Sequence, residues 1–114
     1  MAEPWLRDLR SLLERTAPSP GPGAAVECRH FFGGAAAYAA GRIFMSLTPA
    51  GLALKLPAEA RQQLMEAGAR PLRNFPKGPV KKEYVILPET IARDDQALAP
   101  WIEESIRYAR AGVK

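Results

Sequence analysis

The sequence predicts an α+β domain, a two-layer sandwich in which helices cover an antiparallel sheet of about five strands. Apolar residues recur with the helical period near both ends and in the middle of the chain. Short apolar runs bounded by glycine and proline lie between these segments, as in strands that reverse direction. The order helix, three strands, helix, two strands, helix is typical of this class. At 114 residues we expect a single domain over 1–114.

The first expected element is an N-terminal helix over residues 1–16. Pro4 suits its first turn, where the missing N–H would have no partner in any case. Residues 17–25 follow as a Pro/Gly-rich connection, because three prolines and two glycines cannot continue a helix. The main α+β body is expected over 26–112. The helix should turn one apolar face inward, made of Trp5, Leu6, Leu9, Leu12 and Leu13.

Three strands are expected between residues 26 and 56, in the runs "VECRHFF", "RIFMSL" and "LALKL". Glycine and proline at 39–41 and 48–51 favour tight reversals between them. In the last run leucines alternate with other residues, which predicts one buried face.

The stretch "FFGGAAAYAAGRIF" contains Gly33 and Gly34, which could belong to a phosphate loop or to a bend in a strand. A phosphate loop precedes a helix N-terminus and usually a lysine, and neither follows here. We expect a β-bulge or bend in which glycine tolerates positive φ, with Gly41 in the reversal. The larger side chains of the stretch are expected in the core or on the sheet: Phe31, Phe32, Tyr38, Ile43 and Phe44.

Pro57 is expected to open a second helix, with Ala60, Leu64 and Ala67 facing inward and Gly68 as its left-handed cap. A second hairpin follows, formed by "PLRNF" and "KKEYVIL", with Pro79 on its turn side.

The last helix contains Pro100, which would remove a backbone bond if it lay inside the helix. We therefore expect Asp94 or Asp95 to cap a short turn near 94–98, and the main helix to begin with Pro100 in its first turn. Its inner face would be Trp101, Ile102, Ser105, Ile106 and Ala109.

Composition excludes several classes of protein. No apolar run approaches the ~20 residues of a membrane span, and the N-terminus lacks the apolar centre of a signal peptide, so a cytoplasmic location is expected. Cys28 is the single cysteine, so it cannot form an internal disulfide and is expected to be a small buried hydrophobe. The net charge of +4 permits acidic partners without requiring them.

No catalytic, cofactor or metal site is expected, and the chain is not expected to be an enzyme. Cys28 and His30 would share a strand face, but a zinc site needs at least one further ligand of this kind. None of the serines stands in a nucleophile turn. The acidic pairs near 94 and 103 are explained by helix capping and solvation.

The basic residues of the second hairpin are the one candidate binding site: Arg70, Arg73, Lys77, Lys81 and Lys82. They could contact nucleic-acid phosphates, together with Arg7, Arg10 and Arg15 if the first helix lies on the same side. A solvated face with edge-strand lysines that prevent aggregation explains the hairpin equally well.

Four stretches, in order, resemble signatures of the TfoX N-terminal domain family. "FFGGAAAYAAGRIF" is similar to M-F-G-G-x-G-x-Y-x-x-G-x-M-F, and "LALKL" to the L-Y-L-K strand. "KGPVKKEYVILPE" is similar to the K-G-x-x-V-x-M-x-Y-x-x-P-E hairpin, and "DDQALAPWIEESIRYA" to the closing D-x-x-x-L-x-x-W helix. The run 35–37 replaces the family's later glycine with alanines. The matching motif positions include Gly33, Gly34, Tyr38, Gly41 and Trp101.

The resemblance implies an antiparallel α+β domain related in shape to secretion-chaperone-like folds. TfoX, also called Sxy, regulates bacterial natural competence with the cyclic-AMP receptor protein, and full-length regulators carry a second, helical domain. We therefore expect a stand-alone single-domain member, acting as a non-enzymatic protein-interaction or regulatory module. A protein partner or self-association is expected, without a membrane, cofactor or identified small-molecule substrate. Sequence-independent nucleic-acid binding through the Lys/Arg residues is the alternative.

Overall fold

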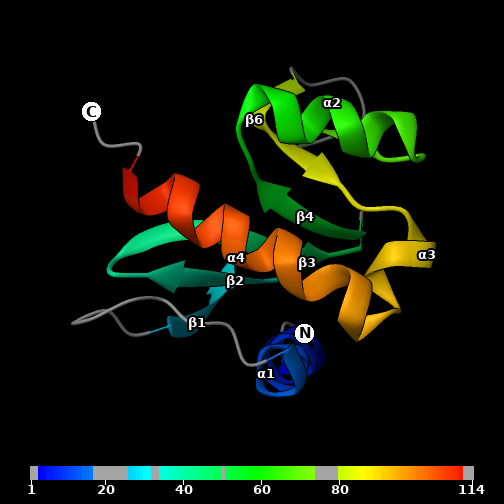
Figure 1. Ribbon diagram of the computed structural model, residues 1–114. Coiled ribbons are helices and arrows are strands. Elements are labelled where there is room, and N and C mark those ends of the chain that lie inside the picture. The colour runs from blue at the N-terminus through cyan, green and yellow to red at the C-terminus, as the bar shows by residue number, and fades with distance from the viewer. Residues whose placement is uncertain (1–2, 17–25, 32–33, 50, 74–79, 112–114) are drawn as a thin grey trace.

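The computed structural model describes residues 3–16, 26–31, 34–49, 51–73 and 80–111. Within these residues the chain forms an α+β domain (Figure 1), and its order of helices and strands agrees with the predicted class. No helix in the described part is long and apolar enough to cross a membrane. The elements are α1 (Glu3–Thr16), β1 (Val26–Phe31), β2 (Gly34–Ala39), β3 (Arg42–Thr48), β4 (Gly51–Lys55), α2 (Ala58–Glu66), β5 (Arg70–Arg73), β6 (Val80–Ile86), α3 (Glu89–Ala92) and α4 (Asp95–Ala111).

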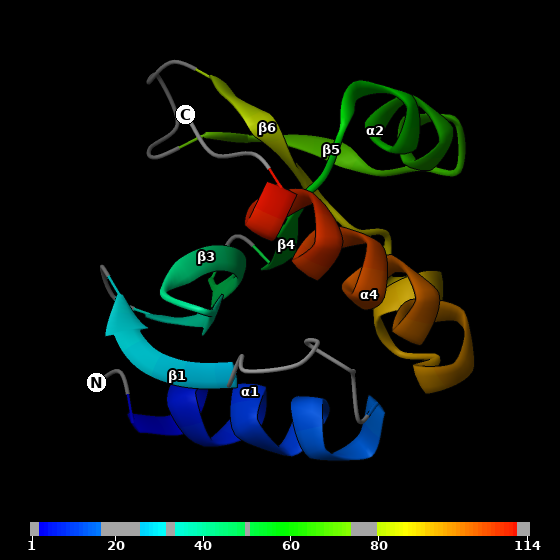
Figure 2. The same ribbon diagram turned by 60° about the vertical axis from the view of Figure 1, so that its left-hand side comes forward.

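The strands form one antiparallel sheet in the order β1-β2-β3-β4-β6-β5. β6 rather than β5 pairs with β4, so β1 and β5 are the two edges. The helix α1 packs against β1, β2 and β3, and α4 packs against β2, β3 and β4. Figure 2 shows α1 running beneath β1. The α2 helix packs against β6. One hydrophobic cluster joins the helices to a single face of the sheet.

The sheet has six strands, whereas the sequence indicates about five. The additional strand is β2, which the alanine-rich run 34–39 forms between the first two expected strands. Alanine has a low intrinsic preference for strands, so apart from Tyr38 this run carries little β signal of its own. Its small side chains Ala35, Ala37 and Ala39 belong to the core cluster, where they lie under α1. Tertiary packing, rather than local propensity, therefore makes this segment a strand.

Gly34 is the first residue of β2 and lies opposite Phe31 in β1. A Cβ atom at Gly34 would lie 2.3 Å from the Leu47 carbonyl oxygen, so glycine is required by the close approach of β3. Gly34 is not among the positive-φ glycines, so the expected bend with positive φ is wrong for this residue. Gly33 lies outside the described residues. The expected reversal at Gly41 is confirmed, with φ of 79°.

The N-terminal helix α1 has the buried face that its spacing predicts. Leu6, Leu9, Leu12 and Leu13 are buried, and Trp5 packs partly buried against the same cluster. The second helix begins after Pro57 and buries Ala60 and Leu64.

The end of α2 differs in one respect from the expectation. Ala67 is exposed rather than inward-facing, because the helix has already ended at Glu66 and Ala67 is its C-cap. Gly68 follows with φ of 110°, which confirms the left-handed cap.

The C-terminal helix begins earlier than predicted. A separate short helix, α3, precedes it, and α4 starts at Asp95, so Pro100 lies inside α4 and the expected turn over 94–98 is wrong. Asp94 caps the helix, since its Oδ1 accepts bonds from the N–H groups of Gln96 (3.0 Å) and Ala97 (3.3 Å). The fully buried Leu98 fixes the first turn in the core, which explains why the helix tolerates the proline.

The expected inner face of α4 is otherwise observed. Ile102, Ser105, Ile106 and Ala109 are buried, and Trp101 is partly buried against the core cluster.

Candidate functional site

The β1 edge, meaning residues 26–31 at the end of the sheet, is the longest described strand edge without a partner strand. Its six residues pair continuously with β2, from Val26 opposite Ala39 to Phe31 opposite Gly34. Among the described residues no strand pairs with the outer side of β1. Such an edge presents alternating unpaired N–H and C=O groups, which is the usual template for adding another strand.

The opposite edge, β5, is much less suited to strand addition. It has only four residues, contains Pro71, and pairs irregularly with β6 between Pro71 and Arg73. A proline cannot donate to a sheet ladder, and short irregular edges resist pairing. Within the described residues the two edges of the sheet therefore differ, and β1 is the one suited to strand addition.

Two charged side chains lie on the outer face of β1. Val26 and Cys28 pack against the core cluster, so the intervening Glu27 and Arg29 project from the other face of the sheet. They form an ion pair of 2.8 Å between Arg29 Nη2 and Glu27 Oε1, with side chains 63% and 57% exposed. The Arg29 guanidinium also lies over the ring of Tyr38, 5.2 Å from its centroid. Because the pair is exposed, its contribution to stability is at most about 1 kcal/mol.

Cys28 is half-buried between these two charged residues. Burial raises the pKa of its thiol, while the positive charge of Arg10 on α1 lowers it. Metal binding requires the thiolate, so burial works against a metal role for Cys28. His30 is exposed two residues further on. No group of three or more metal-ligand side chains occurs within the described ranges.

The predicted basic site maps to β5 and β6, which pair with each other. Arg70 is exposed and lies opposite Ile86, and Arg73 lies opposite Val80. Lys81 and Lys82 belong to β6, and their side chains are outside what the structure describes. Lys77 falls in 74–79, also outside the described residues. The fold therefore gathers four of the five positions on one pair of strands, at the edge opposite β1.

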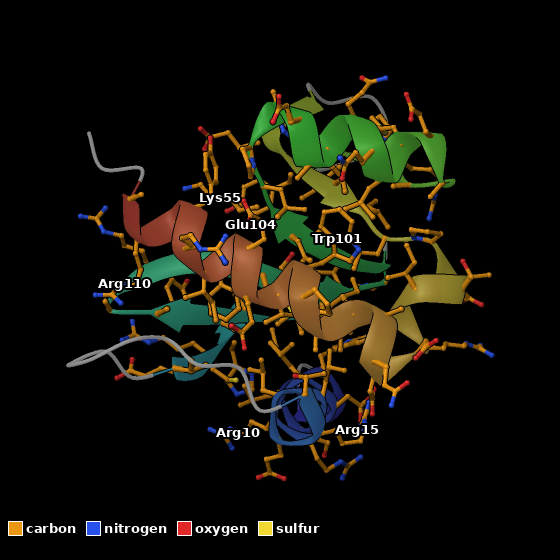
Figure 3. All side chains as sticks on the ribbon, viewed as in Figure 1. Arg10, Arg15, Lys55, Trp101, Glu104 and Arg110 are labelled. Carbon is orange, nitrogen blue, oxygen red and sulfur yellow. The ribbon has the colours of Figure 1, made fainter. Side chains whose placement is uncertain are left out.

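A hollow of about 570 Å³ lies between α1, the β3–β4 turn, β5 and α3. It brings Arg70 of the hairpin together with Arg15 of α1, so one of the three α1 arginines that were conditional members of the basic site lies on the same side as the hairpin. Arg15 is engaged by an ion pair with Asp95 (3.0 Å). Figure 3 shows Arg15 on α1 near the beginning of α4, and Arg10 elsewhere on the same helix.

The remaining charges of this hollow are mixed. Arg93 pairs with Glu89 at 3.4 Å, and Asp8 adds a further carboxylate to the lining. A lining of alternating sign holds an anion less strongly than a purely basic one would. The hollow is therefore a weaker candidate than the β1 edge.

A further polar cluster, which the sequence analysis did not single out, joins α4 to the sheet. Tyr108 donates a hydrogen bond of 3.0 Å to Glu83 Oε2, and Lys55 Nζ lies 3.6 Å from Glu83 Oε1. Partial burial raises the pKa of Tyr108, and the hydrogen bond to Glu83 and the negative charge of Glu83 raise this pKa further. This cluster fastens the C-terminal half of α4 to β4 and β6.

Glu27 and Arg29 are likewise not among the site residues that the sequence predicts. Their signal is present in "ECR", where opposite charges flank one residue of a strand and so share a face. What the sequence does not show is that this strand is an edge.

Comparison with known proteins identifies a family. No curated protein matches the chain. The model of the TfoX N-terminal domain family matches residues 21–109 of the 114. This match covers the sheet, α2, α3 and most of α4, and it includes the β1 edge. The chain therefore belongs to the TfoX N-terminal domain family.

Proposed function

We propose that the chain is a protein-interaction module that accepts a strand of a protein partner on its β1 edge. The observation that carries the proposal is the difference between the two edges of the sheet. β1 is six residues long with continuous register, whereas β5 is short, irregular and contains Pro71. In strand addition, main-chain hydrogen bonds supply affinity and alternate side chains supply specificity. We further propose a regulatory role for this interaction, which is supported only by the family to which the chain belongs.

Proline substitution tests the proposal, because consecutive strand residues direct their N–H groups to opposite sides. Of Arg29 and His30, one directs its N–H toward β2 and the other directs it outward. Proline at the outward position leaves the β1–β2 ladder intact but removes a donor and blocks an added strand. Proline at the other position breaks the ladder. Thermal unfolding of Arg29→Pro and His30→Pro identifies which variant retains the native fold.

The folded proline variant is then compared with the wild type as bait in extracts of the source cells, with the exposed Arg42→Ala on β3 as the control. We expect the wild type and Arg42→Ala to capture the same proteins, or additional copies of the chain itself, and the folded proline variant to lose them. Equal capture by the proline variant would contradict the proposal, as would a wild type that is monomeric and captures nothing.

The second candidate function is sequence-independent binding of nucleic acid at the β5–β6 hairpin. It is favoured by the pairing of the two strands that carry Arg70, Arg73, Lys81 and Lys82. Binding through phosphates would weaken steeply as salt increases.

The test replaces Lys77, Lys81 and Lys82 together by glutamate and measures binding to labelled duplex and single-stranded DNA. The matched control changes the same number of charges elsewhere, at the exposed Arg42, Arg107 and Arg110. Loss of binding only in the hairpin variant would support this second function. Unchanged affinity in that variant would rule out the hairpin as the site.

A further inference from the structure

We propose that the partner strand is β1 of a second copy of the chain, paired antiparallel about a two-fold axis at Cys28. This inference rests on the proposed function, because it requires the β1 edge to accept a strand. It adds the identity of the partner and the register of the pairing. Two six-stranded sheets would join into one continuous sheet with the helices of both copies on the same face.

Symmetry restricts the possible registers. When two copies of one edge strand pair antiparallel about a two-fold axis, that axis is perpendicular to the sheet, so each residue points to the same face in both copies. Directly opposite residues of a strand pair also point to the same face. At the axis, one residue must therefore lie opposite its own copy. Within the middle of β1 the candidate centres are Glu27, Cys28 and Arg29.

Charge selects one of these three registers. An axis at Glu27 places Glu27 opposite itself, and an axis at Arg29 places Arg29 opposite itself. Like charges directly opposite each other destabilise a strand pair. An axis at Cys28 instead places Glu27 of each copy opposite Arg29 of the other, and both side chains lie on the same exposed face. Of these three central registers, only the one centred on Cys28 makes the charges of β1 self-complementary.

The existing ion pair supports this arrangement. Arg29 already reaches Glu27 within the chain, and its guanidinium is oriented by the ring of Tyr38 on the neighbouring strand. In the dimer the same groups would form two cross-strand pairs, one on each side of the axis. On the face of the sheet that carries the helices, Val26 of each copy would lie opposite His30 of the other. The pairing therefore extends over residues 26–30 of both strands.

Charge exchange gives the decisive test, with the dimer measured by analytical ultracentrifugation. Glu27→Arg alone places arginine opposite Arg29, and Arg29→Glu alone places glutamate opposite Glu27. We expect each single variant to weaken dimerisation at least about tenfold, which corresponds to about 1.4 kcal/mol. The double variant E27R/R29E restores opposite charges in the same register, and its dissociation constant should return to within about threefold of the wild type.

The double variant separates this inference from other interfaces. A binding surface that uses these charges against any different sequence would be damaged further by the second substitution rather than restored. Far-UV circular dichroism of every variant checks the fold, which we expect to be unchanged because both side chains are largely exposed. A double variant as weak as the single variants would overturn the inference, as would a wild type that stays monomeric at millimolar concentration.

Oxidative cross-linking tests the position of the axis independently. Directly opposite residues of antiparallel strands have Cα atoms about 4.5 or 5.5 Å apart, within the range that a disulfide spans. An added copper–phenanthroline oxidant would take two electrons from the two Cys28 thiols, which release two protons as the S–S bond forms. Because Cys28 is the only cysteine, any covalent dimer must join these two residues.

We expect rapid cross-linking of the native wild type, and much slower cross-linking in urea or in E27R. Equal rates in native and unfolded protein would overturn the inference.

The failure of this inference is distinguishable from that of the proposed function. If the protein is monomeric but loses a different captured protein when β1 carries the proline, only the identity of the partner is wrong. If it dimerises and the folded proline variant dimerises equally well, the β1 edge itself is wrong.

Discussion

The hydroxyl of Ser105 holds α4 against two strands at once. Its Oγ lies 2.7 Å from the carbonyl oxygens of both Phe44 and Lys55, and the residue is fully buried. Phe44 is the extra residue of a β-bulge, since Ala37 pairs with Met45 and the following Tyr38 pairs with Ile43. A bulge leaves a residue without its usual ladder partner, and the serine compensates for this inside the core.

We therefore expect Ser105→Ala to lower the free energy of unfolding by about 1–3 kcal/mol, because it removes the O–H donor that lies within reach of both carbonyl oxygens in the core. The exposed Ser11→Ala is the control, with an expected change within about 0.5 kcal/mol. Urea denaturation measures both variants. Equal stabilities for the two would show that the hydroxyl does not hold the bulge.

Because of Tyr84, the free energy of unfolding of the chain changes with pH in the alkaline range. Burial, followed by the charges of Glu83 and Tyr38, raises the pKa of Tyr84 to about 12. An unfolded tyrosine ionises near pH 10. Between these values the folded chain keeps the proton that the unfolded chain has released, so stability falls as pH rises.

Tyr84→Phe removes this proton, and we expect the free energy of unfolding to fall less between about pH 9 and about pH 11 than in the wild type. Urea denaturation at the two pH values gives the comparison. Tyr38→Phe is the matched control, because the remaining Tyr84 keeps most of its burial. An equal fall in the wild type and Tyr84→Phe would contradict the assignment.

At the scale of elements, the sequence is informative where side-chain spacing decides the structure. The leucines of α1 and the alternation in β4 predict their buried faces correctly. β2 could not be predicted in this way, because its alanines have no strand preference and become a strand by packing under α1. The edge position of β1 was also inaccessible, since it depends on the order of all the strands. Glu27 and Arg29 acquire their significance only from that position.

Pro100 is the residue for which local sequence rules predict the wrong start of a helix. Those rules place a proline in the first turn, but α4 begins at Asp95 and carries Pro100 in its second turn. The Asp94 cap and the buried Leu98 offset the lost backbone bond.

We therefore expect Pro100→Ala to stabilise the chain by about 1–2 kcal/mol, since it restores a bond to the Gln96 carbonyl but gives the unfolded chain more freedom. Thermal unfolding measures the change, with the nearby exposed Gln96→Ala as a control for the helix surface. A lower stability would mean that the proline sets a bend on which the packing of α4 depends.

At the scale of the whole molecule, the domain has one protected edge and one unprotected edge. Helices cover one face of the sheet, and Pro71 with the irregular register protects β5, but no described strand covers the outer side of β1. Natural proteins usually protect such edges against uncontrolled pairing. In a closed two-fold dimer, the β1 edges of the two copies cover each other. Pairing of unlike edges, such as β1 with β5, would instead continue from copy to copy into a filament.

A closed dimer makes the stability of the whole chain depend on its concentration, because association stabilises only the folded state. For a hundredfold increase in protein concentration above the dissociation constant, we expect the midpoint of thermal unfolding to rise by about 5 °C. The variants Glu27→Arg and Arg29→Glu should show a smaller rise over the same concentrations, because their dissociation constants are higher, and E27R/R29E should regain the wild-type rise. Differential scanning calorimetry over this concentration range measures the effect. A wild-type midpoint that is independent of concentration would show that folding and β1 pairing are not coupled.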